Sequence, residues 1–134
     1  IMPSPETIAA ALAQKERVRI VPYGDNAAYR LGLSGLQVSN LKYLTDGASR
    51  VINLSSGQKI FFNHTSEVKI FDFCNETMQM VSSAIRALTE ECLDAEKKRI
   101  IHRHLRTVPE EEFNRDITIP PAWVGKIIME IWNN

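Results

Sequence analysis

The spacing of apolar residues changes character about halfway along the chain. Before residue 65, short apolar runs alternate with polar positions or stop at turn residues, which predicts strands over 17–23, 41–44, 50–54 and 59–63, the last two as a hairpin. After residue 70, apolar residues recur every three or four positions, as one helical face requires. This segregation predicts an α+β fold, with a small mixed or antiparallel sheet in the N-terminal half packed against C-terminal helices.

Local start and stop signals place the helices. Ser4-Pro5-Glu6 combines a capping hydroxyl, a proline and an acid, so a helix should begin there. Asp25 should cap a short helix through Leu31, which Gly32 should end in the left-handed conformation. Further helices are expected over 94–105 and after Pro109 and Pro121. The clearest helical stripe consists of Phe71, Cys74, Met78, Val81, Ile85 and Leu88.

Composition and charge point to one soluble domain over residues 1–134. The chain is 44% hydrophobic and 24% charged, which is ordinary for a globular protein. Its 16 basic and 16 acidic side chains cancel, so no overall field attracts nucleic acid or a membrane. Without a long apolar run or a signal peptide, we expect a cytoplasmic protein with no membrane contact. Ile1 in place of methionine suggests that something is missing upstream. Cys74 and Cys92 are expected to be reduced and buried.

A set of short motifs stands in a fixed order between residues 24 and 65. It comprises Gly24, Ala27, Ala28, Leu31, Gly32, Leu33, Ser34, Gln37-Val38, Tyr43-Leu44-Thr45-Asp46-Gly47, Ser49-Arg50 and His64-Thr65. In order and separation this set resembles the C-terminal part of the AbiEi-like antitoxins of bacterial type IV toxin–antitoxin systems. The chain departs from that pattern at Ser39, at Ala48 and at Glu67-Val68-Lys69, which weakens a family role for the loop after His64.

The resemblance implies a function. The family combines an N-terminal winged helix that binds operator DNA with a C-terminal domain that counters a nucleotidyltransferase-like toxin. This chain would begin after the winged helix and would be a non-catalytic regulatory domain without metal or cofactor. Its possible partner is the cognate toxin, and it would meet DNA only through the missing N-terminal module.

The motif residues also have a direct physical interpretation. Small alanines allow a helix to pack closely on its neighbours, and Asp46-Gly47 suits a turn that Asp46 holds and that Arg50 neutralises. The functional alternative is a polar recognition patch on one sheet face, where a partner would bind. That patch would consist of Tyr43, Asp46, Ser49, Arg50 and His64.

Two other functions stay open. Asp46 followed by Glu67 and Lys69 resembles the motif of restriction-type nucleases, in which two carboxylates hold Mg²⁺ and the lysine stabilises charge. The common signatures of nucleotide, zinc and serine-hydrolase chemistry are absent, which favours a binding protein over an enzyme. The shared motif could also encode only the fold, leaving a scaffold domain.

The segment 94–106 carries the chain's basic cluster and two histidines. His102 and His104 point about 200° apart around a helix, so they should face solvent or a partner rather than share a metal. The cluster predicts either a solvated face or a contact with phosphate or an acidic toxin surface. Its members are Lys97, Lys98, Arg99, Arg103 and Arg106.

Overall fold

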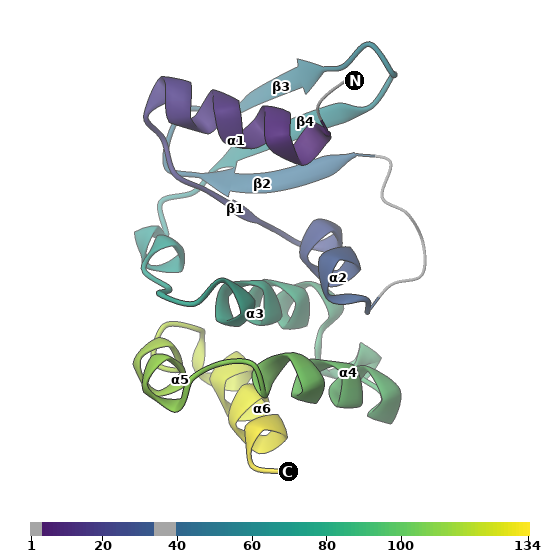
Figure 1. Ribbon diagram of the computed structural model, residues 1–134, viewed down its shortest axis with the longest axis vertical. Helices are drawn as coiled ribbons and strands as arrows, with labels where there is room; N and C mark the ends of the chain where they lie inside the picture. The colour runs from purple at the N-terminus through teal and green to yellow at the C-terminus, as the bar shows by residue number, and fades with distance from the viewer. Residues whose placement is uncertain (1–3, 34–39) are drawn as a thin grey trace.

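The computed structural model describes residues 4–33 and 40–134, and within them it has the predicted α+β architecture (Figure 1). The sheet consists of β1 (Ile20–Pro22), β2 (Leu41–Thr45), β3 (Arg50–Asn53) and β4 (Lys59–His64). The helices are α1 (Pro5–Glu16), α2 (Asp25–Leu31), α3 (Glu76–Leu88), α4 (Ala95–Leu105), α5 (Glu110–Asp116) and α6 (Ala122–Trp132). Two short 3₁₀ helices, η1 (Val68–Phe71) and η2 (Glu90–Cys92), flank α3.

The sheet is mixed, with the strand order β1-β2-β4-β3. β3 and β4 form the predicted antiparallel hairpin, and Gly57 adopts a φ of +92° in its turn. β4 then returns to the middle of the sheet and pairs in parallel with β2, while β1 pairs with β2 in antiparallel fashion at the opposite edge. The 46–49 segment therefore crosses from β2 to a strand that is not its neighbour.

Short-range signals set most of the helix ends. The side chains of Ser4, Asn75 and Asp94 accept hydrogen bonds from backbone N–H groups in the first turns of α1, α3 and α4. Gly32 ends α2 in the left-handed conformation, as predicted, with a φ of +82°. The N-cap of α2, however, is Gly24 with a φ of +63°, so the expectation of an Asp25 cap was wrong.

Two other expected boundaries also shift. The strand predicted from residue 17 begins only at Ile20, because Arg17 takes the left-handed conformation that terminates α1. The helical stripe predicted from residue 71 begins only at Met78, since Phe71 lies in η1 and Cys74 in the following loop. Both short segments carry the right apolar spacing, but backbone breaks separate them from the regular elements.

The apolar side chains bury into two clusters. In Figure 1, α1 lies across one face of the sheet, and the smaller cluster fills the space between them. The larger cluster joins α2 to the helices of the second half, where Ala27 and Ala28 let α2 approach α3 closely. At the other end of this cluster, the Phe113 and Trp132 rings stack with centroids 3.9 Å apart. The small cluster consists of Ala9, Leu41, Tyr43, Ile60 and Phe62.

A buried carboxylate anchors the helical half. Asp116, which is fully buried, accepts hydrogen bonds from the backbone N–H groups of Cys74 at 3.0 Å and Asn75 at 2.9 Å. Asn75 in turn donates from its side-chain amide to Glu112 at 3.0 Å. The end of α5 is thereby fixed to the residues just before α3, 41 and 42 positions earlier in the chain.

The two cysteines correct another expectation. Cys74 and Cys92 are free, but both are exposed rather than buried. Partial desolvation of the thiol, followed by its hydrogen bond to the Asp116 carboxylate, nevertheless raises the pKa of Cys74 above its usual range. Among the residues that the structure describes, no helix is long and apolar enough to cross a membrane.

Candidate partner-binding site

The polar motif residues gather where β2 and β4 end. Because these strands run in parallel, their carboxyl ends lie at the same end of the sheet, and Thr45 is the register partner of His64. The segment between β2 and β3 passes over this end of the sheet and carries Asp46, Gly47 and Ser49. The parallel pairing therefore brings together residues that stand up to 19 positions apart in the sequence.

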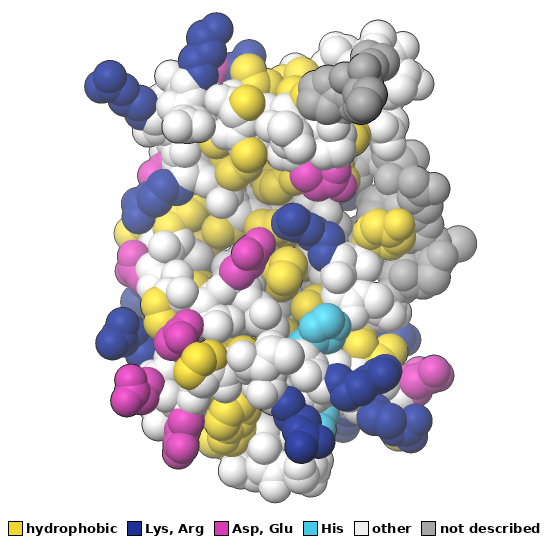
Figure 2. Space-filling model, in the orientation of Figure 1, with side chains coloured by type: hydrophobic (Ala, Val, Ile, Leu, Met, Phe, Trp, Pro, Cys, Tyr) yellow, Lys and Arg dark blue, Asp and Glu magenta, His cyan; other side chains and the backbone are white. Residues whose placement is uncertain are grey.

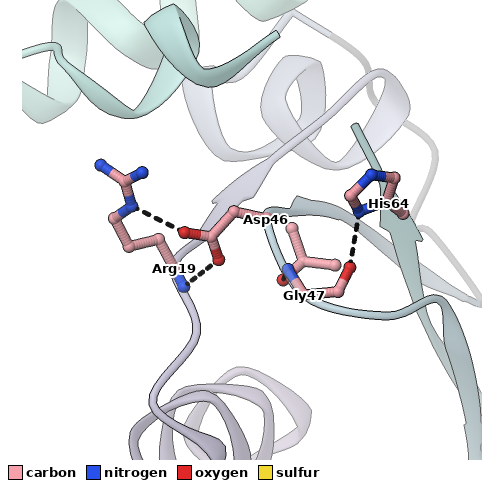
Figure 3. A network of polar contacts seen from close by, with 5 residues as sticks. Arg19, Asp46, Gly47 and His64 are labelled. Carbon is pink, nitrogen blue, oxygen red and sulfur yellow. Dashed lines mark hydrogen bonds and ion pairs between the residues drawn. The ribbon is translucent and has the colours of Figure 1, made fainter. Parts of the chain in front are cut away.

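Asp46 connects the end of β2 to the segment before β1. Its carboxylate accepts the backbone N–H of Arg19 at 2.8 Å and the Arg19 side-chain Nε–H at 2.9 Å (Figure 3). The side-chain bond from Arg19, followed by the backbone bond, holds the pKa of Asp46 below its usual range. The Arg19 guanidinium also lies 5.0 Å from the centroid of the Phe71 ring, which secures it from the η1 side.

Arg50 does not neutralise Asp46, contrary to the sequence-based expectation. It forms an ion pair with Glu16 at the end of α1, and both side chains are about 40% exposed. The β2–β3 segment crosses to the far edge of the sheet, which carries Arg50 away from the β1 side where Arg19 lies. Long-range pairing, which the sequence does not reveal, decides which arginine meets this acid.

His64 is held by the same crossing segment. Its Nδ1 lies 2.8 Å from the carbonyl oxygen of Gly47 (Figure 3), and since a carbonyl only accepts, Nδ1 carries the proton. The backbone N–H of His64 donates to the hydroxyl of Ser49 at 2.8 Å. This tautomer leaves Nε2 of the exposed ring as a hydrogen-bond acceptor.

Gly47 stands where a side chain has no room. A Cβ at this position would lie 2.4 Å from Cγ1 of Val18 and 3.2 Å from its Cβ. The amide of Gly47 also donates to the Thr45 hydroxyl at 3.1 Å. The Asp-Gly turn is therefore set by close packing on the segment that follows α1, in addition to its own hydrogen bonds.

Tyr43 does not belong to an exposed patch. Its side chain is only 3% exposed and packs edge-on against Phe62, with ring centroids 6.0 Å apart and planes at 80°. Burial raises the pKa of this phenol. The predicted five-residue patch thus separates into a core residue, an ion pair of Asp46 with the exposed Arg19, and three exposed side chains. We call the exposed set, Ser49, Arg50 and His64, the sheet-end patch.

The other motif residues have packing and backbone roles where the structure describes them. Ser34 and Gln37, together with Val38 and the divergent Ser39, lie outside the described residues. Thr65 accepts the backbone N–H of Glu67 through its hydroxyl at 3.1 Å. Buried or partly buried motif side chains are Ala27, Ala28, Leu31, Leu33, Leu44, Thr45 and Thr65.

The three residues of the nuclease hypothesis lie in two different environments. Asp46 pairs with Arg19, whereas Glu67 accepts a bond from Arg86 at 3.2 Å. Glu67, Lys69 and Arg86 line one hollow, and Asp46 is not among the residues that line it. Within residues 4–33 and 40–134, no three His, Cys, Asp or Glu side chains group as ligands for one metal ion.

The histidines on α4 have different surroundings. His104 is half-buried, and its Nε2–H donates to the carbonyl oxygen of Leu31 at 2.7 Å, which fixes α4 to the end of α2. The expectation that it faces solvent or a partner was therefore wrong. His102 instead lines a surface hollow between α4 and α6. Neither the Asp116 anchor nor the His104 bond has a local signature in the sequence.

Comparison with known proteins places the chain in a family. A family model described as "Family of unknown function (DUF6088)" matches residues 1–113. Since this match covers most of the 134 residues, the chain belongs to the DUF6088 family. Searches of curated proteins and of solved structures gave no match.

Proposed function

We propose that this DUF6088 protein is a non-catalytic antitoxin domain of a bacterial type IV toxin–antitoxin pair. It opposes a nucleotidyltransferase-like toxin in the cytoplasm by binding it, and it works with an upstream winged helix that binds operator DNA. The proposal draws its biology from the resemblance of residues 24–65 to AbiEi-like antitoxins. The sheet-end patch is the proposed contact surface.

The observation that carries the proposal is the fixed geometry of an exposed histidine. The ring of His64 is locked at Nδ1 by the Gly47 carbonyl, and its backbone is held by Ser49. Side chains that are already ordered lose little conformational entropy on binding, which improves affinity without new contacts. Nε2 of His64, which has no hydrogen-bond partner within residues 4–33 and 40–134, offers a partner an acceptor, and the Arg50 guanidinium, which pairs with Glu16, offers its remaining N–H donors.

The patch is suited to the centre of an interface rather than to all of it. Arginine is enriched in protein interfaces and often contributes most of the binding energy. A standard interface covers roughly 800 Å² on each partner, far more than three side chains present. The rest of the contact would therefore come from neighbouring surfaces of α1 and the hairpin.

Co-expression with the product of the neighbouring gene tests the proposal. If that product arrests growth, the wild-type chain should restore it and should co-purify with the toxin. Arg50→Glu and His64→Ala should weaken both effects, while the matched charge reversal Lys126→Glu, at an exposed position of α6 in the helical half, should not. Melting temperatures of the three variants establish that each remains folded.

Two results would contradict the proposal at different levels. A neighbouring product that is harmless, or whose toxicity persists in a well-expressed pair, would overturn the antitoxin function. Full rescue and co-purification by both patch variants would keep that function but overturn the sheet-end patch as the contact surface.

A further inference from the structure

The solvent-facing side of α4 carries a stripe of cations. Arg99, His102, Arg103 and Arg106 are separated by three, one and three positions, so they share one side of the helix, and Lys98 flanks them. Arg99, Arg103 and Arg106 are exposed. Figure 2 shows Lys and Arg side chains gathered over the α4 region at the lower right. We call Arg99, Arg103 and Arg106 the basic stripe.

The stripe makes no ion pair within the described part of the chain. Arg19, Arg50, Arg86 and Lys97 all form ion pairs with carboxylates, but no ion pair involves the basic stripe among residues 4–33 and 40–134. Like charges three or four positions apart on a helix repel one another. An anionic partner would therefore be attracted by the stripe and would also relieve this repulsion.

The helix that presents the stripe is firmly fixed. Asp94 caps its first turn by accepting the backbone N–H of Lys97 at 2.8 Å, and Ile101 and Leu105 are fully buried beneath it. The His104 bond to Leu31 anchors its last turn. The three guanidinium groups thus project from a rigid base, with Cα positions rising by about 6 Å over four residues.

An aromatic hollow adjoins the stripe. It has a volume of about 420 Å³ and is lined by His102, Leu105, Arg106, Trp132 and Asn134. Trp132 is half-buried and is held in place by stacking on Phe113. An indole beside an arginine is the combination on which a nucleobase stacks, while the arginine binds the adjoining phosphate.

We propose that the basic stripe and this hollow bind single-stranded nucleic acid. The guanidinium groups of Arg99, Arg103 and Arg106 contact successive phosphates, and a base enters the hollow beside Trp132. Phosphate matches the planar, bidentate geometry of arginine. An acidic protein surface would satisfy the charges but has no need of the aromatic hollow, so a nucleic acid strand explains both features. This function is independent of the proposed toxin contact, which lies on the sheet.

Fluorescence anisotropy with labelled single strands of about 12 nucleotides, oligo-U and oligo-dT, tests the proposal, since such sites span about 4–16 nucleotides. Three phosphate contacts give a salt dependence of roughly −2.1 in log–log slope, so a change from about 50 to 200 mM salt should weaken binding about 18-fold. Arg103→Glu should weaken binding about tenfold or more and flatten the slope by about 0.7 for the one phosphate contact it removes. Arg115→Glu is the matched control, because Arg115 is also exposed in the last turn of a helix.

The emission of Trp132 tests the hollow separately. In a Trp123→Phe background, Trp132 is the sole tryptophan, and oligonucleotide binding should quench it. Equal loss of binding with Arg103→Glu and Arg115→Glu, or binding with no change in Trp132 emission, would overturn the site. Binding of poly-glutamate in preference to both oligonucleotides would assign the stripe to an acidic protein and overturn the nucleic acid proposal.

Discussion

Substitution of Gly47 by alanine tests whether packing against Val18 fixes the conformation of the 46–49 segment, which joins β2 to β3. The new Cβ would lie 2.4 Å from Cγ1 of Val18, whereas carbon atoms in favourable contact lie about 3.5–4.0 Å apart. One of the two groups must move by about 1 Å, and valine resists because its χ1 angle is stiff. Overpacking of this kind costs roughly 1–3 kcal/mol. The reduced flexibility of the unfolded chain offsets about 0.4–1 kcal/mol of this cost.

We therefore expect Gly47→Ala to lower the free energy of unfolding by about 1–2 kcal/mol, the difference between those two contributions. For a chain of this size that corresponds to a fall of roughly 5 °C in melting temperature. Urea and thermal unfolding, followed by circular dichroism, measure both quantities. The Gly47 carbonyl, which accepts a hydrogen bond from His64 Nδ1, would shift with the backbone, so the position of the His64 ring in the sheet-end patch should become less fixed as well.

A second substitution isolates the clash from other effects. Val18→Ala removes Cγ1, and because Val18 is half-buried this change alone should cost about 1 kcal/mol. The loss in the double variant should fall short of the sum of the two single losses by at least about 1 kcal/mol, because the clash with Cγ1 of Val18 is gone. Losses that add to within about 0.5 kcal/mol would refute the packing argument.

Two further predictions concern carboxylates that the fold places. Asp116→Ala leaves the partly buried N–H groups of Cys74 and Asn75 without their acceptor, so it should destabilise the protein by about 2–4 kcal/mol, or about 1–2 for each group; a loss under about 1 kcal/mol in urea unfolding would contradict the anchor. Asp46→Asn should destabilise at pH 7, because the folded state holds the pKa of Asp46 below its unfolded value. The stability that the ionised Asp46 contributes is present above the unfolded pKa and disappears as the pH falls through the folded pKa. The free energies of unfolding of wild type and variant should therefore converge in acid. A difference between them that persists in acid would exclude the Arg19 ion pair as its source.

Local sequence signals predicted most regular elements. The C-terminal end of α2 is as expected because Gly32 is strongly specialised for helix ends, and the β3–β4 hairpin followed from its Gly57 turn. Expectations failed where the same residue types could serve two purposes. Asp25 and Gly24 both suit a helix start, and only the backbone geometry shows that Gly24 occupies the cap.

The polar contacts were harder to predict, because they join distant segments. Arg19 and Arg50 lie on either side of Asp46 in the sequence, and the strand order alone determines which of them binds it. The motif around Asp46 identified where the polar residues gather, but not that Tyr43 would turn into the core. The basic cluster on α4 was visible from composition, whereas the hollow beside Trp132 requires α4 and α6 to pack together.

The division of the apolar side chains into two clusters also bears on how the molecule opens. The cluster beneath α1 rests on five buried side chains, among them Ala9 and Tyr43, whereas the helical cluster is far more extensive. Because the free energy of opening follows the apolar surface that is lost, the layer of α1 and the sheet forms a cooperative unit of lower stability. Sub-global fluctuations will therefore expose the strands while the helices stay folded, and β3, at the edge of the sheet, becomes the point from which unpairing spreads.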